Sequence, residues 1–565
     1  MEYEILLVNI SRHPIAQSSS FQDCIGHYLI AAYLRQRDFV AQVYSGSVQD
    51  TMDVLSRELG EKHVGIVGFY AAADNIDVVA HTVRWVKKTF QAITVIGGPQ
   101  AIALDEDFFI SSGNDYAIIG EGEIPIYKLL SVLIDQDGRL EDVPSLIYRT
   151  PVSGQLIQNP IDGATIDDLD SIPFPHIEDS LTRRLRMSET AGIITGRGCP
   201  NHCTFCYEGG NSKYVRFRSI ENVMEEIDYV QQNNPHLKYL NVYDDTFTLN
   251  PERVLHFCAE IKKRKIHWFC EGHVSFVVQH PDILRTMVDS GLACIQFGIE
   301  SGSQKVLDAY HKRTNRAMIL DCIRICKEAG LHNATGNFII GGAWESKETL
   351  QESMSLAAEM LAVGRGIVEL YTVYFAPYPH TEIERTPETF GLSIDSDRLE
   401  WNLHTMRSPV VHTQMLTSSM IHDAKVAFDS FLDQHYSIEA RQSTKQDFLQ
   451  SMCLDGHITN YNPNWRKAFS ELPYYMDFLN HCTAEEQRFD PNKYMIRTFE
   501  DYKLEGNLMT TPAGIFSGTE KDILLYSTGK LSVNEVASRL NLSLEIIQQI
   551  FFQLNNRCLL YMSWL

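Results

Sequence analysis

Residues 196–207 read GRGCPNHCTFCY, and this short run contains three cysteines, Cys199, Cys203 and Cys206. Thiolates are the usual ligands of iron–sulfur clusters, and a four-iron cluster normally takes four of them. Three thiolates in one loop therefore predict a 4Fe–4S cluster in which one iron is left open for another ligand. The glycines before Cys199 and the aromatic Phe205 suit a tight loop that shields such a cluster from water.

A zinc knuckle, or three unrelated buried cysteines, is the alternative interpretation. Structural zinc sites usually draw four Cys or His ligands from two paired clusters. His202 is available as a fourth ligand, but it lies inside the loop itself, and no second ligand pair follows downstream. The flanking sequence favours the iron–sulfur interpretation at several independent points.

The cysteine loop resembles the signature of the radical S-adenosylmethionine (SAM) enzymes, in which an aromatic residue stands beside the last cysteine. This resemblance implies that SAM chelates the open iron through its amino and carboxylate groups. It also implies that one electron, from a donor such as flavodoxin or ferredoxin, cleaves SAM to methionine and a 5′-deoxyadenosyl radical.

Composition limits the class of protein. The chain has 565 residues, 44% of them hydrophobic, which predicts about three or four globular domains. The apolar runs are too short to cross a bilayer, and the N-terminus reads as a strand without a secretion signal, so we expect a cytoplasmic protein with no membrane partner. The net charge of −23 argues against a nucleic-acid partner, because phosphate binding needs clustered Lys and Arg.

The first region, residues 1–150, alternates short apolar runs with amphipathic segments. Strands are expected at 5–10, 64–69, 94–96 and 116–119, with helices at 27–37 and 78–89. The alternation predicts a doubly wound parallel sheet covered by helices on both faces. Ligands of such sheets lie at the carboxyl ends of the strands, and there glycines allow a bulky ligand to approach the backbone.

The same region resembles the cobalamin-binding domain that precedes the catalytic core in one class of radical SAM enzymes. The resemblance rests on Gly97-Gly98-Pro99 and on the segment 116–123, YAIIGEGE. A histidine motif that supplies a cobalt ligand in mutases is missing, since RHPI at 12–15 does not match it. A scaffold that has lost the cofactor is the alternative. The residues that the resemblance assigns to cobalamin are Tyr70, Gly97, Gly98, Pro99, Gly120, Glu121, Gly122 and Glu123.

The middle region, residues 186–400, follows a proline-containing linker at 151–185. Apolar strand segments recur at 193–195, 240–243, 266–270, 295–299, 337–340 and 370–375, and they predict a partial or complete β/α barrel. Acidic and polar residues stand where several of these strands end, so they are expected to ring one mouth of the barrel. A helix N-cap is the alternative role for any one of them.

By resemblance, the mouth residues bind SAM. Asp244 and Asp245 take the place of the motif that contacts the amino group, Glu300 and Ser301 that of the ribose or carboxylate contact, and the strand 336–342 meets adenine. Glu271 is a further acid of the ring. Arg216 and Arg218 also match the class pattern, or they only stabilise the loop. The expected SAM contacts are Asp244, Asp245, Glu271, Glu300, Ser301 and Gly341.

Two regions follow the expected barrel. Residues 401–510 look helical and are predicted to cap the barrel mouth and shape a substrate pocket. Residues 511–565 read as helix, turn, helix, turn, helix and short strand, which resembles a winged-helix module. On so acidic a chain, contact with a protein or peptide, such as a precursor peptide, or simple packing on the rest of the chain, is favoured over DNA binding.

The first functional hypothesis is a cobalamin-dependent radical SAM methyltransferase. By resemblance it methylates an unactivated carbon, or phosphorus, of a small metabolite or peptide. A radical cyclase, rearrangement or oxidation enzyme that keeps cobalamin without net methyl transfer is the second hypothesis. A non-catalytic cofactor-binding sensor is the third. The catalytic residues beyond the cluster ligands are not identified by the sequence.

Overall fold

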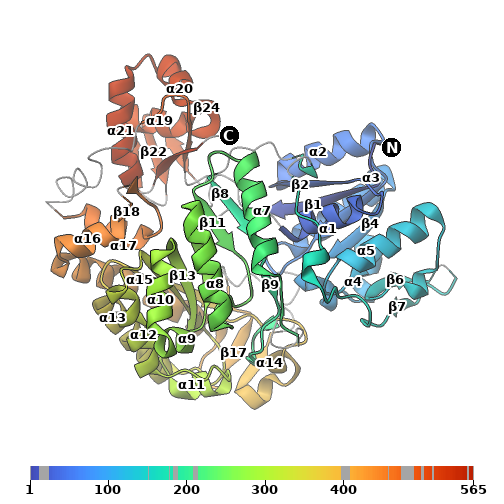
Figure 1. Ribbon diagram of the computed structural model, residues 1–565, viewed down its shortest axis with the longest axis horizontal. Coiled ribbons are helices and arrows are strands. Elements are labelled where there is room, and N and C mark those ends of the chain that lie inside the picture. Colours follow the sequence, from blue (N-terminus) through green and yellow to red (C-terminus); the bar gives the residue numbers. More distant parts are fainter. Residues whose placement is uncertain are drawn as a thin grey trace.

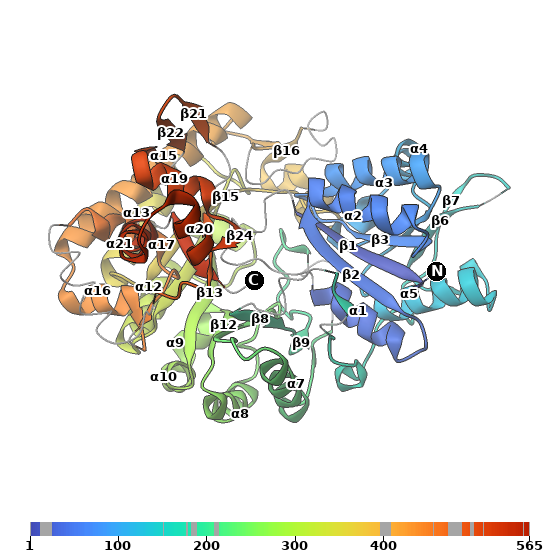
Figure 2. The ribbon, with the colours of Figure 1, turned by 90° about the horizontal axis from the view of Figure 1, so that it is seen from above.

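The computed structural model describes residues 2–11, 25–150, 152–176, 179–181, 189–207, 214–395, 408–455, 457–472, 489–497, 502–511, 514–556 and 559–563. Three bodies follow one another along the chain: an N-terminal α/β domain, a central β/α domain and a smaller C-terminal module (Figure 1). In the view from above, the N-terminal sheet lies opposite the central domain, and the segment around β9 (Gly196–Arg197) passes between them (Figure 2).

The N-terminal domain is the expected doubly wound sheet. Within the described ranges its strand order is β2-β1-β3-β4-β5-β6-β7, parallel from β2 to β5, with β6 and β7 antiparallel. The strands are β1 (Ile5–Ser11), β2 (Ala41–Ser47), β3 (Ile66–Tyr70), β4 (Ile93–Gly97), β5 (Tyr116–Ile118), β6 (Leu146–Arg149) and β7 (Leu156–Gln158). The helices are α1 (Ile25–Arg35), α2 (Val48–Gly60), α3 (Ile76–Phe90), α4 (Glu106–Ser112) and α5 (Glu123–Leu130).

Alternating side chains of the strands supply the two cores of this domain. Ile5 and Leu7 of β1 pack with α1 and α5, whereas Leu6 and Val8 pack on the opposite face with α3. Both faces are apolar because helices cover both, which is the usual condition of a parallel sheet. The sequence pattern did not predict β2 and α2; β2 (AQVYSGS) is an edge strand in which polar and small residues weaken the apolar signal.

The central domain is a partial barrel. In the described part of the chain its strands run parallel in the order β8-β11-β12-β13-β14-β15. They are β8 (Thr190–Ile193), β11 (Tyr239–Val242), β12 (His267–Gly272), β13 (Leu292–Glu300), β14 (Asn333–Ile340) and β15 (Val368–Tyr374). The covering helices include α7 (Ile220–Asn233), α8 (Pro251–Ile261), α9 (Val274–Gln279), α10 (Pro281–Asp289), α11 (Gln304–Ala309), α12 (Arg316–Glu328) and α13 (Lys347–Val363). All six expected strands are present.

A long helix, α15 (Ser418–Gln442), covers the outer edge of this sheet. The Tyr436 hydroxyl accepts a hydrogen bond from the Leu370 N–H at 2.8 Å and donates one to the Val368 carbonyl at 3.2 Å. These backbone groups belong to the edge strand β15, whose free N–H and C=O groups would otherwise be open to another strand. The helix starts at the carboxyl end of the sheet, near Gly341, where Ile421 packs.

The following helices, α16 (Lys445–Met452) and α17 (Pro463–Ser470), lie at the opposite end of the sheet. His332, just before β14, contacts the Gln450 carbonyl at 2.7 Å, and Glu369 near the start of β15 accepts from the Asn464 N–H at 3.0 Å. These are amino ends of strands, so this part of 401–510 does not cap the mouth as the sequence analysis expected. The reason is a set of buried polar groups at the amino end, which α16 and α17 satisfy.

The C-terminal module has its own apolar core. Its elements are β20 (Tyr494–Arg497), β21 (Lys503–Glu505), β22 (Leu508–Thr511), β23 (Gly514–Ser517), α19 (Gly518–Tyr526), β24 (Thr528–Ser532), α20 (Val533–Leu540), α21 (Leu544–Asn556) and β25 (Leu560–Ser563). The expected helices are present. However, β20 lies between β24 and β25, so the module starts before residue 511. The winged-helix assignment stays a prediction.

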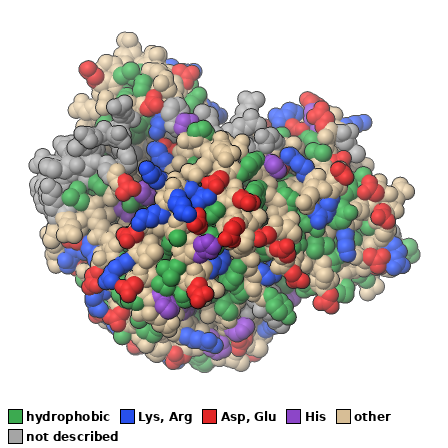
Figure 3. Space-filling model, in the orientation of Figure 1, with side chains coloured by type: hydrophobic (Ala, Val, Ile, Leu, Met, Phe, Trp, Pro, Cys, Tyr) green, Lys and Arg blue, Asp and Glu red, His purple; other side chains and the backbone are tan. Residues whose placement is uncertain are grey.

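The described helices include none that is long and apolar enough to span a bilayer. Basic and acidic side chains are interspersed over the face drawn in Figure 3.

Candidate functional site

The cysteine loop lies at the carboxyl end of β8. Cys199, Cys203 and Cys206 form no disulfide, and each is partly exposed. Thr204, between the last two, donates its hydroxyl to the Ala309 carbonyl at 2.8 Å. The Phe205 ring packs on Tyr310 with the ring centroids 4.7 Å apart. The loop is therefore anchored in part through its non-cysteine residues, and its reduced, partly exposed thiols fit the binding of a cluster.

Two aspartates at the end of β11 hold the start of this loop. The Thr195 N–H and hydroxyl donate to Asp244 at 2.6 and 2.5 Å, and the Gly196 N–H donates to it at 2.9 Å. The Gly198 N–H donates to Asp245 at 2.7 Å. Burial raises the pKa of Asp244, while these donors oppose the rise. Both oxygens of Asp244 are thus engaged by the chain itself, so it positions the loop.

The remaining acids of the expected ring surround one buried lysine. Lys312 Nζ lies 2.9 Å from Glu300 Oε1, and both side chains are almost fully buried. Glu300 adopts a left-handed backbone with φ of 63°, which is uncommon for a residue with a side chain. Burial raises the pKa of Cys203, whereas the nearby Lys312 lowers it. A cation beside the thiols fits an anionic iron–sulfur cluster.

Glu271, at the carboxyl end of β12, is the acid with the most perturbed titration of this ring. Burial raises the pKa of Glu271 to about 7, and the nearby Asp245 raises it further. Lys312 acts in the opposite direction. A carboxyl group poised near neutrality in a strand-end ring is typical of a functional site.

Ser301 and Gly341 differ from the other expected SAM contacts. Ser301 is fully buried, and its Oγ lies 3.1 Å from Ser353 Oγ of α13, so it joins the loop after β13 to α13. The Gly341 N–H donates to Glu345, a buried acid that the sequence analysis did not single out. Burial raises the pKa of Glu345 to about 8. Glu345 therefore shapes the glycine turn after β14.

The carboxyl edge of the N-terminal sheet contains open space. Among the residues that the structure describes, a Cβ placed on Gly97 or Gly120 would meet no atom within 4 Å. Gly98 serves packing instead, because a Cβ there would lie 2.6 Å from the Ala71 carbonyl oxygen and 2.9 Å from the Tyr70 ring. Pro99 begins a short 3-10 turn directly after it. The open glycines provide room for a large ligand against the backbone.

Glu121 and Glu123 have partners in the other domain. Arg197 donates to Glu121 at 2.9 Å and to Glu123 at 2.5 Å, and Arg216 forms an ion pair with Glu121. Gly122 between them faces Ile30 of α1. The GEGE segment thus joins the N-terminal sheet to the start of the cysteine loop.

A tyrosine of the central domain lies where the two domains meet. Tyr378 follows the carboxyl end of β15, and burial raises its pKa, with further rises from Asp74 and Cys206. Asp74 belongs to the loop after β3, and its neighbour Ala73 packs on the core of the central domain. The carboxyl ends of both sheets therefore approach each other beside the cysteine loop.

Sequence reasoning missed Arg197, Lys312, Glu345 and Tyr378 as members of this site. Arg197 stands inside the quoted motif, and its place between two glycines was an available signal. Lys312 and Tyr378 lie in loops whose sequence has no helical or strand periodicity. Only the fold brings them close to the cysteines.

A parallel β/α sheet with three cysteines in the loop after its first strand defines a radical SAM domain. The model of the radical SAM superfamily matches residues 193–357. Residues 193–357 are thus a radical SAM domain, and the expectations of a 4Fe–4S cluster and SAM are confirmed by this match.

Known proteins similar to the chain extend the comparison. An uncharacterized methyltransferase of Pyrococcus horikoshii is 25% identical over 406 residues, which cover 70% of this chain and 84% of that protein. The anaerobic magnesium-protoporphyrin IX monomethyl ester cyclase of Cereibacter sphaeroides is 27% identical over 321 residues, covering 54% of this chain and 50% of the cyclase. The chain thus spans about half of the cyclase's length.

A solved structure shares the arrangement of domains. The radical SAM methyltransferase TsrM of Kitasatospora setae, with cobalamin and a 4Fe–4S cluster bound, superposes with a TM-score of 0.60 at 14% identity, over 84% of this chain and 100% of that one. At this identity the similarity concerns the fold. The expected fold class is confirmed.

We predict that Asp244→Asn loosens the cysteine loop. Asparagine keeps one acceptor oxygen for the N–H groups of residues 195 and 196, but its N–H₂ group replaces the oxygen that accepts the Thr195 hydroxyl, and all three hydrogen bonds lose the carboxylate charge that strengthens them. The free energy of unfolding should fall by about 2–4 kcal/mol, and iron bound after reconstitution should fall to below about half of wild type. Denaturant unfolding and iron analysis measure these effects. Asp282→Asn, at an exposed position of α10, is the control; equal iron content in the two variants would contradict the assignment.

We predict that Glu271→Gln stabilises the cofactor-free protein at alkaline pH. The pKa of Glu271 is raised from 4.5 to about 7 in the folded state. Between these values the unfolded chain ionises first, so wild-type stability falls as pH rises through this window. At pH 8 the variant should exceed wild type by about 2 kcal/mol, with no gain near pH 4. Urea unfolding across this range tests it, and a pH-independent difference would count against the raised pKa.

Proposed function

We propose that the protein is a cobalamin-dependent radical SAM methyltransferase. The observation that carries the proposal is the approach of two strand-end sites: the open edge of the N-terminal sheet at Gly97 and Gly120 lies beside the cysteine loop, joined to it through Arg197. The methyltransferase names of two similar proteins, one of them holding cobalamin, support it.

The chain's own residues divide the work of binding. Cys199, Cys203 and Cys206 would hold the cluster, and Asp245, Glu271, Glu300 and the Gly341 turn would line the SAM site. Tyr70, Gly97, Pro99 and Gly120 would line the cobalamin site. When bound, the cluster and SAM supply a radical that removes a substrate hydrogen, and cobalamin supplies the methyl group.

The protein's residues orient these groups and exclude water between them. Asp244 fixes the backbone that carries Cys199, and Lys312 sets a positive charge beside Cys203. Tyr378 places a phenol between the two strand-end sites. The acceptor is an unactivated carbon, or phosphorus, of a small metabolite or peptide.

The proposal predicts two separable cofactors. After anaerobic purification with cobalamin supplied, wild type should contain iron, sulfide and a corrin absorption band. Cys203→Ala should lose the cluster, because a thiolate ligand is missing, and should keep the corrin band. Iron and sulfide analysis with visible spectra measures both. A cluster without corrin in wild type would overturn the cobalamin assignment and leave a cobalamin-free radical SAM enzyme.

A radical cyclase that keeps cobalamin without net methyl transfer is the second candidate, favoured by the similarity to the Cereibacter sphaeroides cyclase. Methyl-labelled SAM distinguishes the two, because only a methyltransferase moves the label into product.

The C-terminal module supports a peptide as the substrate class. The strands β21 and β23 are the outer strands of a small antiparallel sheet, and Leu504, Leu508 and Ile515 on it are 52%, 45% and 65% exposed. An extended peptide can pair with an exposed strand edge while its apolar side chains contact such residues.

This substrate proposal predicts that Ile515→Lys weakens peptide docking. Random peptides displayed against the full chain should yield binders whose affinity falls about tenfold or more in this variant, because a charge replaces an apolar contact. Val426→Lys, at a similarly exposed position of α15, is the matched control. Binders that respond equally to both variants would remove the support for a peptide substrate at this surface.

A further inference from the structure

Four charged side chains form a buried network across the two domains. Arg197 and Arg216 come from the central domain, and Glu121 and Glu123 from the loop after β5 and the start of α5. Their exposed fractions are 15%, 14%, 20% and 4% in that order. The four formal charges sum to zero, so each cation depends on the acids for compensation away from water.

The two arginines face each other on a short antiparallel pair, β9 (Gly196–Arg197) and β10 (Arg216–Phe217). Like charges directly opposite each other on neighbouring strands are unfavourable. Glu121 lies between the two guanidinium groups and accepts from Arg197 at 2.9 Å and from Arg216 at 3.2 Å through the same oxygen. The β9–β10 pair that carries the cysteine loop therefore needs an anion from the N-terminal domain.

The network reaches both proposed cofactor sites through the backbone. Arg197 lies between Gly196 and Gly198 and precedes Cys199 by two positions. The Gly196 N–H donates a hydrogen bond to Asp244, and the Gly198 N–H donates one to Asp245. On the other side, Glu121 directly follows the open Gly120. A movement of either loop must displace the ion pairs that bind it to the other.

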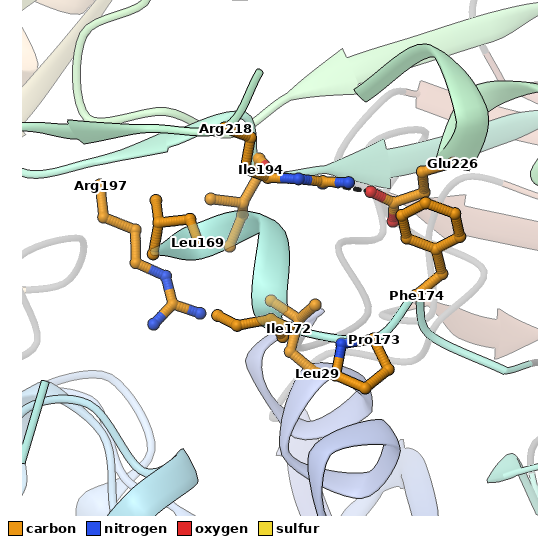
Figure 4. A pocket seen from close by; sticks show the side chains of 9 residues that line it. All are labelled: Leu29, Leu169, Ile172, Pro173, Phe174, Ile194, Arg197, Arg218 and Glu226. Atoms are coloured by element: carbon orange, nitrogen blue, oxygen red, sulfur yellow. Dashed lines mark hydrogen bonds and ion pairs between the residues drawn. The ribbon is translucent and has the colours of Figure 1, made fainter. Parts of the chain in front are cut away.

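Both arginines also contact the linker between the domains, so a movement of one loop would have to be accompanied by a movement of the other. Arg216 also donates to the Ile166 carbonyl of the linker at 2.6 Å. Arg197 further lines a small pocket with Leu29 of α1 and with Leu169 and Ile172 of the linker. Figure 4 shows its side chain beside these apolar groups and separate from the Arg218–Glu226 ion pair of the same pocket.

We propose that Arg197, Arg216, Glu121 and Glu123 are positioning residues that couple the cluster site to the cobalamin site. Ordering the cysteine loop around a cluster fixes Arg197, which fixes the Gly120–Glu123 loop, so the corrin site is better ordered, and binds corrin more tightly, when the cluster is present. Coupling is reciprocal, so bound corrin also protects the cysteine loop. This inference rests on the proposed function for its ligands. It gives Glu121 and Glu123 an indirect role, through the arginines, in place of direct cobalamin contact.

The test uses the full chain with hydroxocobalamin as the probe. The dissociation constant is measured by absorbance with the cluster reconstituted and in the Cys203→Ala background. We expect binding about tenfold or more tighter with the cluster in wild type. In Glu121→Gln the two constants should agree within about twofold. Asp142→Asn is the matched control, because it breaks the exposed Arg139–Asp142 pair of the same domain.

Hydrogen exchange gives a second readout that needs no cobalamin. Amides of residues 194–199 should exchange about fivefold faster in Glu121→Gln than in wild type or Asp142→Asn. Arg216→Lys keeps the charge and loses the two-pronged contact, so it should show the same change to a smaller degree. It is the variant to examine when Glu121→Gln gives too little folded protein.

The outcomes separate the coupling from the proposed function. Equal corrin affinity of wild type with and without the cluster overturns the coupling and leaves the function standing. Wild type that binds no corrin overturns the proposed function, and the exchange rates then decide the network alone. Exchange unchanged in both Glu121→Gln and Arg216→Lys overturns the positioning role.

Discussion

The site depends on hydrogen bonds that two aspartates accept from backbone N–H groups of the cysteine loop. A loop that must expose three thiols cannot bury its own backbone in regular secondary structure, so its polar groups need partners from elsewhere. Asp244 and Asp245 supply them at residues 195, 196 and 198. Because both follow β11, the neighbour of β8 in the sheet, the register of two strands sets the place of the cysteines.

The same strand ends contain groups that lower the stability of the folded protein. Glu271 and Glu345 are buried acids with pKa values raised to about 7 and 8, which means that their charged forms are poorly compensated. Glu300 adds a left-handed backbone beside a buried lysine. Such local strain persists where the surrounding structure holds it, and in this chain the long apolar strands β13 and β14 do so.

Sequence patterns were sufficient where one physical signal dominated. The strands β13, β14 and β15 of the central domain are largely buried on both faces, so their apolar runs were readable, and so were the polar or glycine residues that follow them. The sequence pattern did not predict the edge strand β2 or the helix α2, because an edge strand is only partly apolar. The position of α16 and α17 was also beyond the sequence, since it depends on polar partners such as His332 and Glu369, which are far away in the chain. In the candidate site, the sequence was sufficient to identify the cysteines and the acids at the strand ends. Only the structure shows which of these side chains hold the loop in place and which remain available to a ligand.

The hydroxyl of Tyr436 has a consequence for how the central sheet ends. It occupies one outward-facing N–H and one outward-facing C=O group of the edge strand β15. Another strand can pair with this part of β15 only by displacing α15, so the helix that packs on the sheet also protects its edge from pairing between molecules.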